Sequence, residues 1–170
     1  PSLLPQWKDE LASKFNLDFI NQQNDTRFVD VFSHDLLLMS HASASYPEKA
    51  TALQEVLWDL VIVDEAHSMK NSATKKHQLV KNLSKRNLLL LSATPIQNNL
   101  EELYNMVELL HPGHLGTWKQ FEEKYSLGKN ARSINPAHKN ELQNILSQLI
   151  IRTTRKEVRN YIKFTDRIPN

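Results

Sequence analysis

Three short apolar runs, each followed at once by polar residues, constrain the fold of this chain most. They are residues 36–39, 60–63 and 88–91. Helical patterns separate them, at residues 47–57 and in a lysine-rich stretch at 74–84. Short buried strands that alternate with helices are typical of a mostly parallel sheet flanked by helices. The sequence therefore predicts an α/β fold, with functional side chains just beyond the carboxyl ends of the strands.

The remaining segments extend this pattern. Residues 6–15 have helical spacing, and residues 19–20 form a further short strand candidate. From residue 99 onward the chain turns helical, and residues 126–137 are expected to form a polar loop. We interpret the amphipathic stripes of the helical part as core packing; they comprise Leu100, Leu103, Tyr104, Val107 and Leu110, then Trp118, Phe121 and Tyr125, then Leu142, Ile145, Leu146, Leu149 and Ile150.

Composition excludes several classes of protein. The chain has no cysteine, which excludes disulfides and thiolate metal sites. Its apolar runs are too short to span a bilayer, and the first residues do not form a signal peptide. The net charge of +2 is compatible with nucleic-acid binding but does not indicate it. Basic clusters at residues 75–76, 85–86 and 152–159 are most simply solvated faces.

Glycine is scarce. The three glycines are Gly113, Gly116 and Gly128, and none belongs to a phosphate loop of the form GxxxxGK[ST]. We therefore expect this chain to lack a phosphate cradle of its own.

Two adjacent carboxylates follow the apolar run at residues 60–63. Asp64 and Glu65 begin the sequence Asp-Glu-Ala-His, which ends at His67. The first carboxylate suits Mg²⁺, which prefers oxygen ligands and keeps several of its waters. The second points elsewhere and can orient or deprotonate an attacking water. This arrangement predicts hydrolysis of a metal-bound nucleotide.

Hydroxyl side chains follow the next strand candidate. Ser92, Ala93 and Thr94 come directly after residues 88–91. Such residues often cap a following turn. At the end of a neighbouring strand they could also hydrogen-bond His67, so the two segments together predict one site.

The segments around these residues carry a resemblance to a known family. Residues 62–71, with a Lys-Asn pair after the acidic box, resemble the Walker B segment of Swi/Snf-type ATPases of helicase superfamily 2. Residues 86–100, with the run Thr-Pro-Ile-Gln-Asn-Asn, resemble its motif III. Residues 1–7 resemble its motif Ia, and residues 151–158 its closing motif. The resemblance covers nearly the whole chain. It implies a partial RecA-like lobe at residues 1–112 and a helical extension at 113–170.

The resemblance also implies roles for individual residues. Asp64 would hold Mg²⁺ and Glu65 would activate water for the hydrolysis of ATP. His67 would complete this catalytic set and, with Ser92 and Thr94, would couple the nucleotide site to the DNA site and a second lobe. Coupling to DNA and to a second lobe would involve Ser92, Ala93, Thr94, Gln97 and Asn98. The DNA track would lie near Ser2, Gln6, Trp7 and Ser40. The implied partner is double-stranded DNA, gripped by its phosphates and read by its shape.

Some residues depart from the family pattern. Ile151 stands where many members have arginine, which puts a phosphate contact there in doubt. The run Ser92-Ala93-Thr94 replaces a Thr-Gly-Thr common among eukaryotic members and points to a bacterial one. We expect the phosphate loop and the second lobe, with its arginine finger, to lie outside this chain. On that view the isolated chain is inactive, and the strand at 88–91 presents a bare edge.

Two other classes remain open. One is another superfamily 2 motor, such as an RNA helicase or a restriction-type enzyme; Gln97, Asn98 and Trp7 argue against it. The other is a non-enzymatic interaction module. The intact Asp64–Glu65 pair argues against this class for a longer parent protein, but the class stays open for this chain alone. The expected location is the cytoplasm for a bacterial protein and the nucleus for a eukaryotic one.

Overall fold

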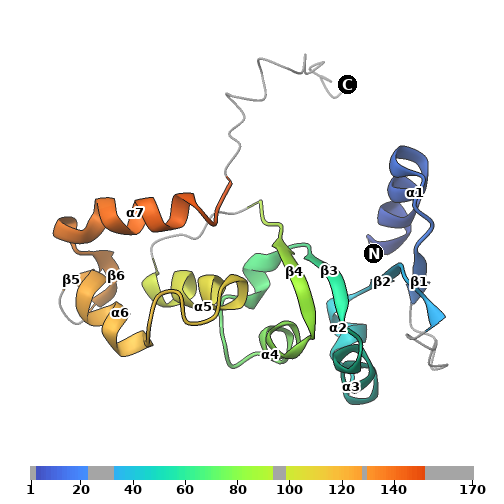
Figure 1. The fold of residues 1–170 in the computed structure, drawn as a ribbon, viewed down its shortest axis with the longest axis horizontal. Helices are drawn as coiled ribbons and strands as arrows, with labels where there is room; N and C mark the ends of the chain where they lie inside the picture. The colour runs from blue at the N-terminus through green and yellow to red at the C-terminus, as the bar shows by residue number, and fades with distance from the viewer. Residues whose placement is uncertain (1–2, 23–32, 94–98, 128–129, 152–170) are drawn as a thin grey trace, which may run out of the picture.

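The computed structural model describes residues 3–22, 33–93, 99–127 and 130–151. The elements in these ranges, drawn in Figure 1, are α1 (Leu4–Phe15), β1 (Ile20–Gln22), β2 (Leu37–Met39), α2 (His41–Ala44), α3 (Pro47–Glu55), β3 (Trp58–Val63), the 3-10 turn η2 (Ala66–Met69), α4 (Lys75–Asn82), β4 (Lys85–Leu90), α5 (Leu100–Leu110), α6 (Trp118–Tyr125), β5 (Ser126–Leu127), β6 (Asn130–Ile134), η3 (Pro136–His138) and α7 (Lys139–Ser147).

Strands β3 and β4 form the parallel pair that the apolar runs predict. Their register joins Trp58 to Lys85 at one end and Val63 to Leu90 at the other. Helix α4 connects them, and Thr74 caps its start by accepting a hydrogen bond from the backbone N–H of His77. Because the strands are parallel, both carboxyl ends lie at the same edge of the pair. The predicted site residues follow those two ends.

One face of this pair is packed and the other is open. The packed face joins a core of Val63, Ala66, Met69, Val80, Met106 and Leu109. On the open face, Leu60 and Ile62 are each 52% exposed and Leu89 is 45% exposed. In the described ranges β4 pairs with β3 alone. The bare edge expected for this strand stays a prediction.

A second parallel pair lies beside α1 in Figure 1. Strands β1 and β2 pair in register from Ile20 and Leu37 onward. In the described residues they form a separate two-stranded sheet and do not extend the β3–β4 pair. Helix α3 buries Ala52 and Leu53 against side chains that include Leu37 of β2.

The helical part forms its own core at the far end of α5 from the sheet (Figure 1). Helix α6 begins with a capping box in which Thr117 and Gln120 satisfy each other's backbone N–H groups. The amphipathic stripes predicted from the sequence pack together, and the core they form consists of Leu100, Leu103, Val107, Phe121, Tyr125 and Leu142.

The prediction of a polar loop at residues 126–137 is wrong. The segment contains the antiparallel strands β5 and β6 and the turn η3. The backbone N–H of Asn135 donates to the carbonyl of Tyr125 at 2.8 Å, which fixes the return of the chain. Polar composition did not reveal this hairpin because its strands are short, and the described apolar side chains Leu127 and Ile134 are 55% and 40% exposed.

Candidate functional site

The ends of β3 and β4 are joined by main-chain hydrogen bonds. The backbone N–H of Leu91 donates to the carbonyl of Val63 at 2.8 Å, and the N–H of Ala66 donates to the carbonyl of Leu91 at 2.9 Å. Ala66 is completely buried. These bonds clamp the segment that holds Asp64 and Glu65 against the segment that leads to Ser92.

Both oxygens of the Asp64 carboxylate accept hydrogen bonds. Oδ1 accepts from the backbone N–H of Glu65 at 2.9 Å. Oδ2 accepts from the indole Nε1–H of Trp7, on α1, at 3.3 Å. The side chain is half-buried, and its position at the carboxyl end of β3 is the one predicted from the sequence.

Glu65 has a left-handed backbone, with φ 51° and ψ 43°. This conformation costs a residue other than glycine about 1–2 kcal/mol and is concentrated at functional sites. Because of this backbone conformation, the Glu65 side chain does not continue the extended path of β3 that leads to Asp64. The Glu65 carboxylate instead reaches His67, with Oε2 at 3.0 Å from Nδ1. The two acids therefore face different surroundings, as two separate roles require.

Helices α4 and α5 hold the segment after the acidic box. Lys70 forms an ion pair with Glu102 at 2.9 Å, and its carbonyl accepts a hydrogen bond from Asn105 at 2.9 Å. The buried ring of His77 contacts the carbonyl of Met69 at 2.9 Å, so its Nδ1 carries the proton. The rigid backing of this segment fits a site whose geometry has to be preserved.

His41 is a neighbour of Asp64 that sequence analysis missed. Burial lowers the pKa of His41 most, and the Lys76 ammonium lowers it further. The Asp64 carboxylate and the Asp64 backbone act in the opposite direction. The signal was available, because His41 follows the end of β2 as Asp64 follows the end of β3. The segment that follows β2 thus lies near Asp64.

The predicted coupling residues are described only in part. Ser92 and Ala93 are exposed directly after the end of β4. Thr94, Gln97 and Asn98 lie outside the described residues. The contact expected between His67 and the hydroxyls of Ser92 and Thr94 therefore stays a prediction.

The predicted DNA-track residues lie at two helix starts. Gln6 and Trp7 are on the first turn of α1, and Gln6 donates to Glu10 at 3.3 Å. Ser40 caps α2 by accepting from the backbone N–H of Ser43 at 3.1 Å. Ser2 lies outside the described residues. Of these residues, Trp7 is the one that hydrogen-bonds Asp64.

The oxygen atoms at Asp64 suit a magnesium ion that keeps most of its waters. In the described ranges there is no group of three or more His, Cys, Asp or Glu side chains that could enclose a metal. One carboxylate with a second beside it matches an ion that keeps its waters and takes further oxygens from nucleotide phosphates. Asp64 is the residue that would hold it, because each carboxylate oxygen retains acceptor capacity beyond its one hydrogen bond.

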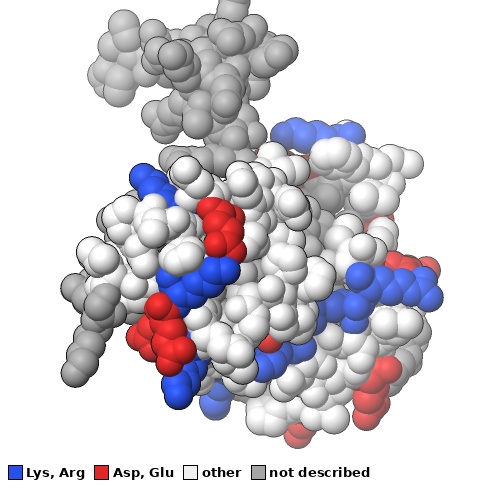
Figure 2. Space-filling model, turned by 60° about the vertical axis from the view of Figure 1, so that its left-hand side comes forward, with Lys and Arg blue, Asp and Glu red and all other residues white. Residues whose placement is uncertain are grey.

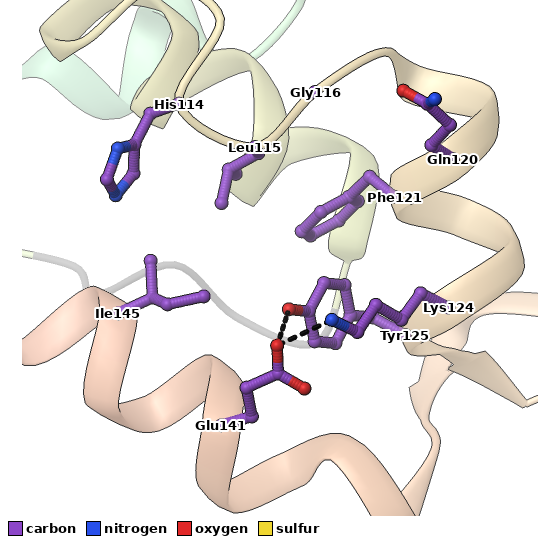
Figure 3. Close-up of a pocket in the computed structure, with 9 residues that line it drawn as sticks. All are labelled: His114, Leu115, Gly116, Gln120, Phe121, Lys124, Tyr125, Glu141 and Ile145. Atoms are coloured by element: carbon purple, nitrogen blue, oxygen red, sulfur yellow. Dashed lines mark hydrogen bonds and ion pairs between the residues drawn. The ribbon is translucent and has the colours of Figure 1, made fainter.

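Among the hollows of the described surface, two are relevant to a binding site. The first, of about 340 Å³, lies between α6 and α7, where Glu141 accepts hydrogen bonds from Tyr125 and Lys124 (Figure 3). Burial and the bond to Glu141 raise the pKa of Tyr125. None of the predicted site residues lines this hollow. The second, of about 250 Å³, is lined by Leu3, Gln6, Trp7 and Glu10 of α1 and its start.

Surface charge does not mark a nucleic-acid site on the face in Figure 2. Lysine and arginine side chains there lie beside aspartate and glutamate, with uncharged surface between the groups. Among the described residues, Arg86 forms an ion pair with Asp59 at 2.7 Å. Among the described helices, none has the length and apolar character needed to cross a membrane.

Comparison with known proteins gives the family. The model of the SNF2-related domain matches residues 1–167. The chain therefore belongs to the SNF2-related domain family, a group of helicase-like ATPases with a RecA-like core, as the motifs indicated.

Individual relatives agree with this assignment. The chain is 37% identical over 156 residues to the uncharacterized ATP-dependent helicase YqhH of Bacillus subtilis, covering 92% of this chain and 27% of that protein. It is 24% identical over 177 residues to the mouse DNA repair and recombination protein RAD54B, covering 95% of this chain and 20% of that protein.

Solved structures share the fold. The SWI2/SNF2 ATPase core of Sulfolobus solfataricus in complex with double-stranded DNA matches with a TM-score of 0.74 and 31% identity, over 90% of this chain and 32% of the other. The same core domain in a second structure matches at 0.74 and 29%, over 95% and 33%. This chain thus spans about a quarter to a third of the proteins named here, except RAD54B, of which it spans 20%.

Proposed function

We propose that this chain is part of an ATP-dependent translocase that moves along double-stranded DNA. In the longer protein, called the parent below, ATP hydrolysis would drive movement that displaces bound proteins without necessarily separating the strands. Family membership and the structural likeness to an ATPase core solved with duplex DNA support this proposal. Its location would be the cytoplasm of a bacterium or the nucleus of a eukaryote.

The observation that carries the proposal is the pair of carboxylates clamped at the ends of β3 and β4. Asp64 would hold Mg²⁺, which supplies charge neutralisation for the phosphates. Glu65, turned away by its left-handed backbone, would orient or deprotonate the attacking water. His67, 3.0 Å from Glu65, would hold that carboxylate in place.

The coupling and DNA roles are proposed from the resemblance of these segments to the family motifs. Ser92, Ala93 and Thr94, with Gln97 and Asn98, would relay the state of the nucleotide to DNA and a second lobe. Ser2, Gln6, Trp7 and Ser40 would lie near the DNA track. The described part of this arrangement supports such a relay, because main-chain hydrogen bonds already join the segment of Asp64 to the segment of Ser92.

The parent would supply what this chain lacks. Residues 1–112 would form a RecA-like lobe without its phosphate loop, and residues 113–170 the helical extension toward a second lobe. An arginine finger from that lobe would contribute about 10³ to 10⁵ in rate. We therefore expect the isolated chain to be inactive.

The test is ATP hydrolysis by the parent with duplex DNA, single-stranded DNA or RNA, with the 170-residue chain assayed alongside. Strong stimulation by duplex DNA and a silent isolated chain are the expected results. Stimulation by RNA alone would identify an RNA helicase instead. No hydrolysis by the parent under any of these conditions would favour an interaction module.

A further inference from the structure

The indole of Trp7 contacts the proposed metal ligand from a helix far away in the sequence. Trp7 and Asp64 are separated by 57 positions, yet Nε1 lies 3.3 Å from Oδ2. The indole N–H can only donate, and the carboxylate accepts. The contact is partly buried, which protects it from competition with water.

This bond completes the orientation of the Asp64 side chain. The backbone N–H of Glu65 fixes Oδ1 from the same strand end, at 2.9 Å. The bond to Oδ2 is the second anchor, and a carboxylate held at both oxygens cannot rotate freely about its final bond. Hydrogen bonds of this kind, behind the ligand, orient metal ligands in proteins.

The donor lies on the helix that the proposed function places near DNA. Trp7 is in the first turn of α1, and its side chain also lines the shallow hollow formed with Leu3, Gln6 and Glu10. A ligand seated against the start of α1 would therefore contact the helix that holds the indole. A shift of the helix start by a fraction of an ångström would change the bond to Asp64, because its length is already near the limit for a hydrogen bond.

We propose that Trp7 is a positioning residue that orients Asp64 for Mg²⁺ and makes this orientation depend on what occupies the start of α1. The inference rests on the proposed function and deepens it, since it gives DNA a direct route to the metal ligand. This route runs from α1 to Asp64 and does not need the segment after β4.

The test compares two tryptophan substitutions in the parent. Trp7→Phe keeps a large ring but removes the N–H donor. Trp58→Phe is the matched control, because the Trp58 indole also donates a hydrogen bond, at 2.9 Å to the carbonyl of Leu53. The readout is the Mg²⁺ concentration that gives half-maximal binding of a fluorescent, non-hydrolysable ATP analogue, measured with and without duplex DNA.

Trp7→Phe is expected to raise the Mg²⁺ requirement about tenfold, as loss of a bond behind a metal ligand typically does. It is also expected to remove the effect of duplex DNA on that requirement, while Trp58→Phe retains it. The inference is overturned if Trp7→Phe has the same Mg²⁺ requirement as the wild type. It is also overturned if Trp58→Phe shifts the requirement equally, since a general effect on stability would then explain both.

Two additions keep the result interpretable. If Trp7→Phe does not fold, benzothienylalanine at position 7 replaces it, because this residue keeps the shape of tryptophan without the N–H. If duplex DNA stimulates ATP hydrolysis by the wild type, but the Trp7 and Trp58 variants have the same Mg²⁺ requirement, only the positioning role is refuted. If duplex DNA does not stimulate ATP hydrolysis by the wild type, the proposed function itself is refuted.

Discussion

The two halves of the described chain differ in how they bury their apolar side chains. In the β3–β4 pair, Leu60 and Ile62 remain 52% exposed on one face. In the helical part, Phe121 and Leu142 are 1% exposed and pack with three further aromatic rings, those of Tyr104, Trp118 and Tyr125. The helical part therefore has a closed core, whereas the sheet part has an open face.

The proposed catalytic residues lie in the sheet part, whereas the helical part contains the closed core. The acidic pair and the left-handed Glu65 lie at the end of the open sheet, where backbone strain is placed next to a proposed reaction. The helical part carries a capping box and a closed aromatic cluster, and none of its described residues is assigned to catalysis. Substitutions should thus affect turnover in the sheet part and folding in the helical part.

The largest effect is expected from Glu65→Gln in the parent. Loss of the group that activates water should reduce ATP turnover about 10² to 10⁴-fold, because general acid–base groups contribute in that range. Nucleotide binding should stay close to wild type. Glu101→Gln, an exposed change at the start of α5, is the control. Normal turnover in Glu65→Gln would remove this residue from its role.

The next largest effect is expected from a leucine-to-alanine substitution, which can be made in each half of the described chain. Leu142→Ala in the closed core should lower the free energy of unfolding by about 2–5 kcal/mol. Leu60→Ala on the open face should change it by only about 0.5 kcal/mol or less in the 170-residue chain, because an exposed side chain leaves no cavity. Chemical denaturation measures both. Equal losses would mean that the open face is covered in solution.

A smaller effect is expected at the end of β4. Ser92→Ala combined with Thr94→Ala should lower the ratio of DNA-stimulated to basal ATP hydrolysis several-fold in the parent, since these hydroxyls are proposed to relay the state of the nucleotide. Steady-state rates with and without duplex DNA measure this ratio. An unchanged ratio would show that coupling does not pass through this segment.

The smallest effect concerns the exposed cluster between α6 and α7. Hydrogen bonds from Lys124, then from Tyr125, lower the pKa of Glu141 below its ordinary value of 4.5. A lowered pKa in the folded state means that Glu141 stabilises the fold above pH 4.5 and loses this contribution as pH falls through the folded-state pKa.

Glu141→Gln should therefore lower the melting temperature at neutral pH. The difference from wild type should shrink as the pH is taken well below 4.5. Thermal unfolding followed across this pH range measures it. A difference that does not depend on pH would assign the effect to packing and not to charge.

Much of the sheet part could be predicted from the sequence. The apolar runs led to β2, β3 and β4, and strand polarity then placed Asp64 and Ser92 at one edge. These features follow from local pattern and from the geometry of parallel strands, so they need no knowledge of distant contacts. The helices of the closed core were predictable for the same reason, because their stripes repeat at helical spacing.

The rest depends on contacts between distant residues. The bond from Trp7 to Asp64 joins two segments whose relative position no local pattern encodes. The left-handed backbone of Glu65 occurs in the segment held between the ends of β3 and β4, and glutamate has no intrinsic preference for this conformation. The strands of the β5–β6 hairpin are too short to leave an apolar pattern.

The central claim is movement along duplex DNA driven by ATP, and displacement of a third strand from a DNA triplex by the parent tests it most directly. We predict that the parent releases the third strand only when ATP and Mg²⁺ are present, and that Glu65→Gln releases none. Full ATP hydrolysis on the same DNA with no release of the third strand would contradict the claim, because it would separate the ATPase from translocation.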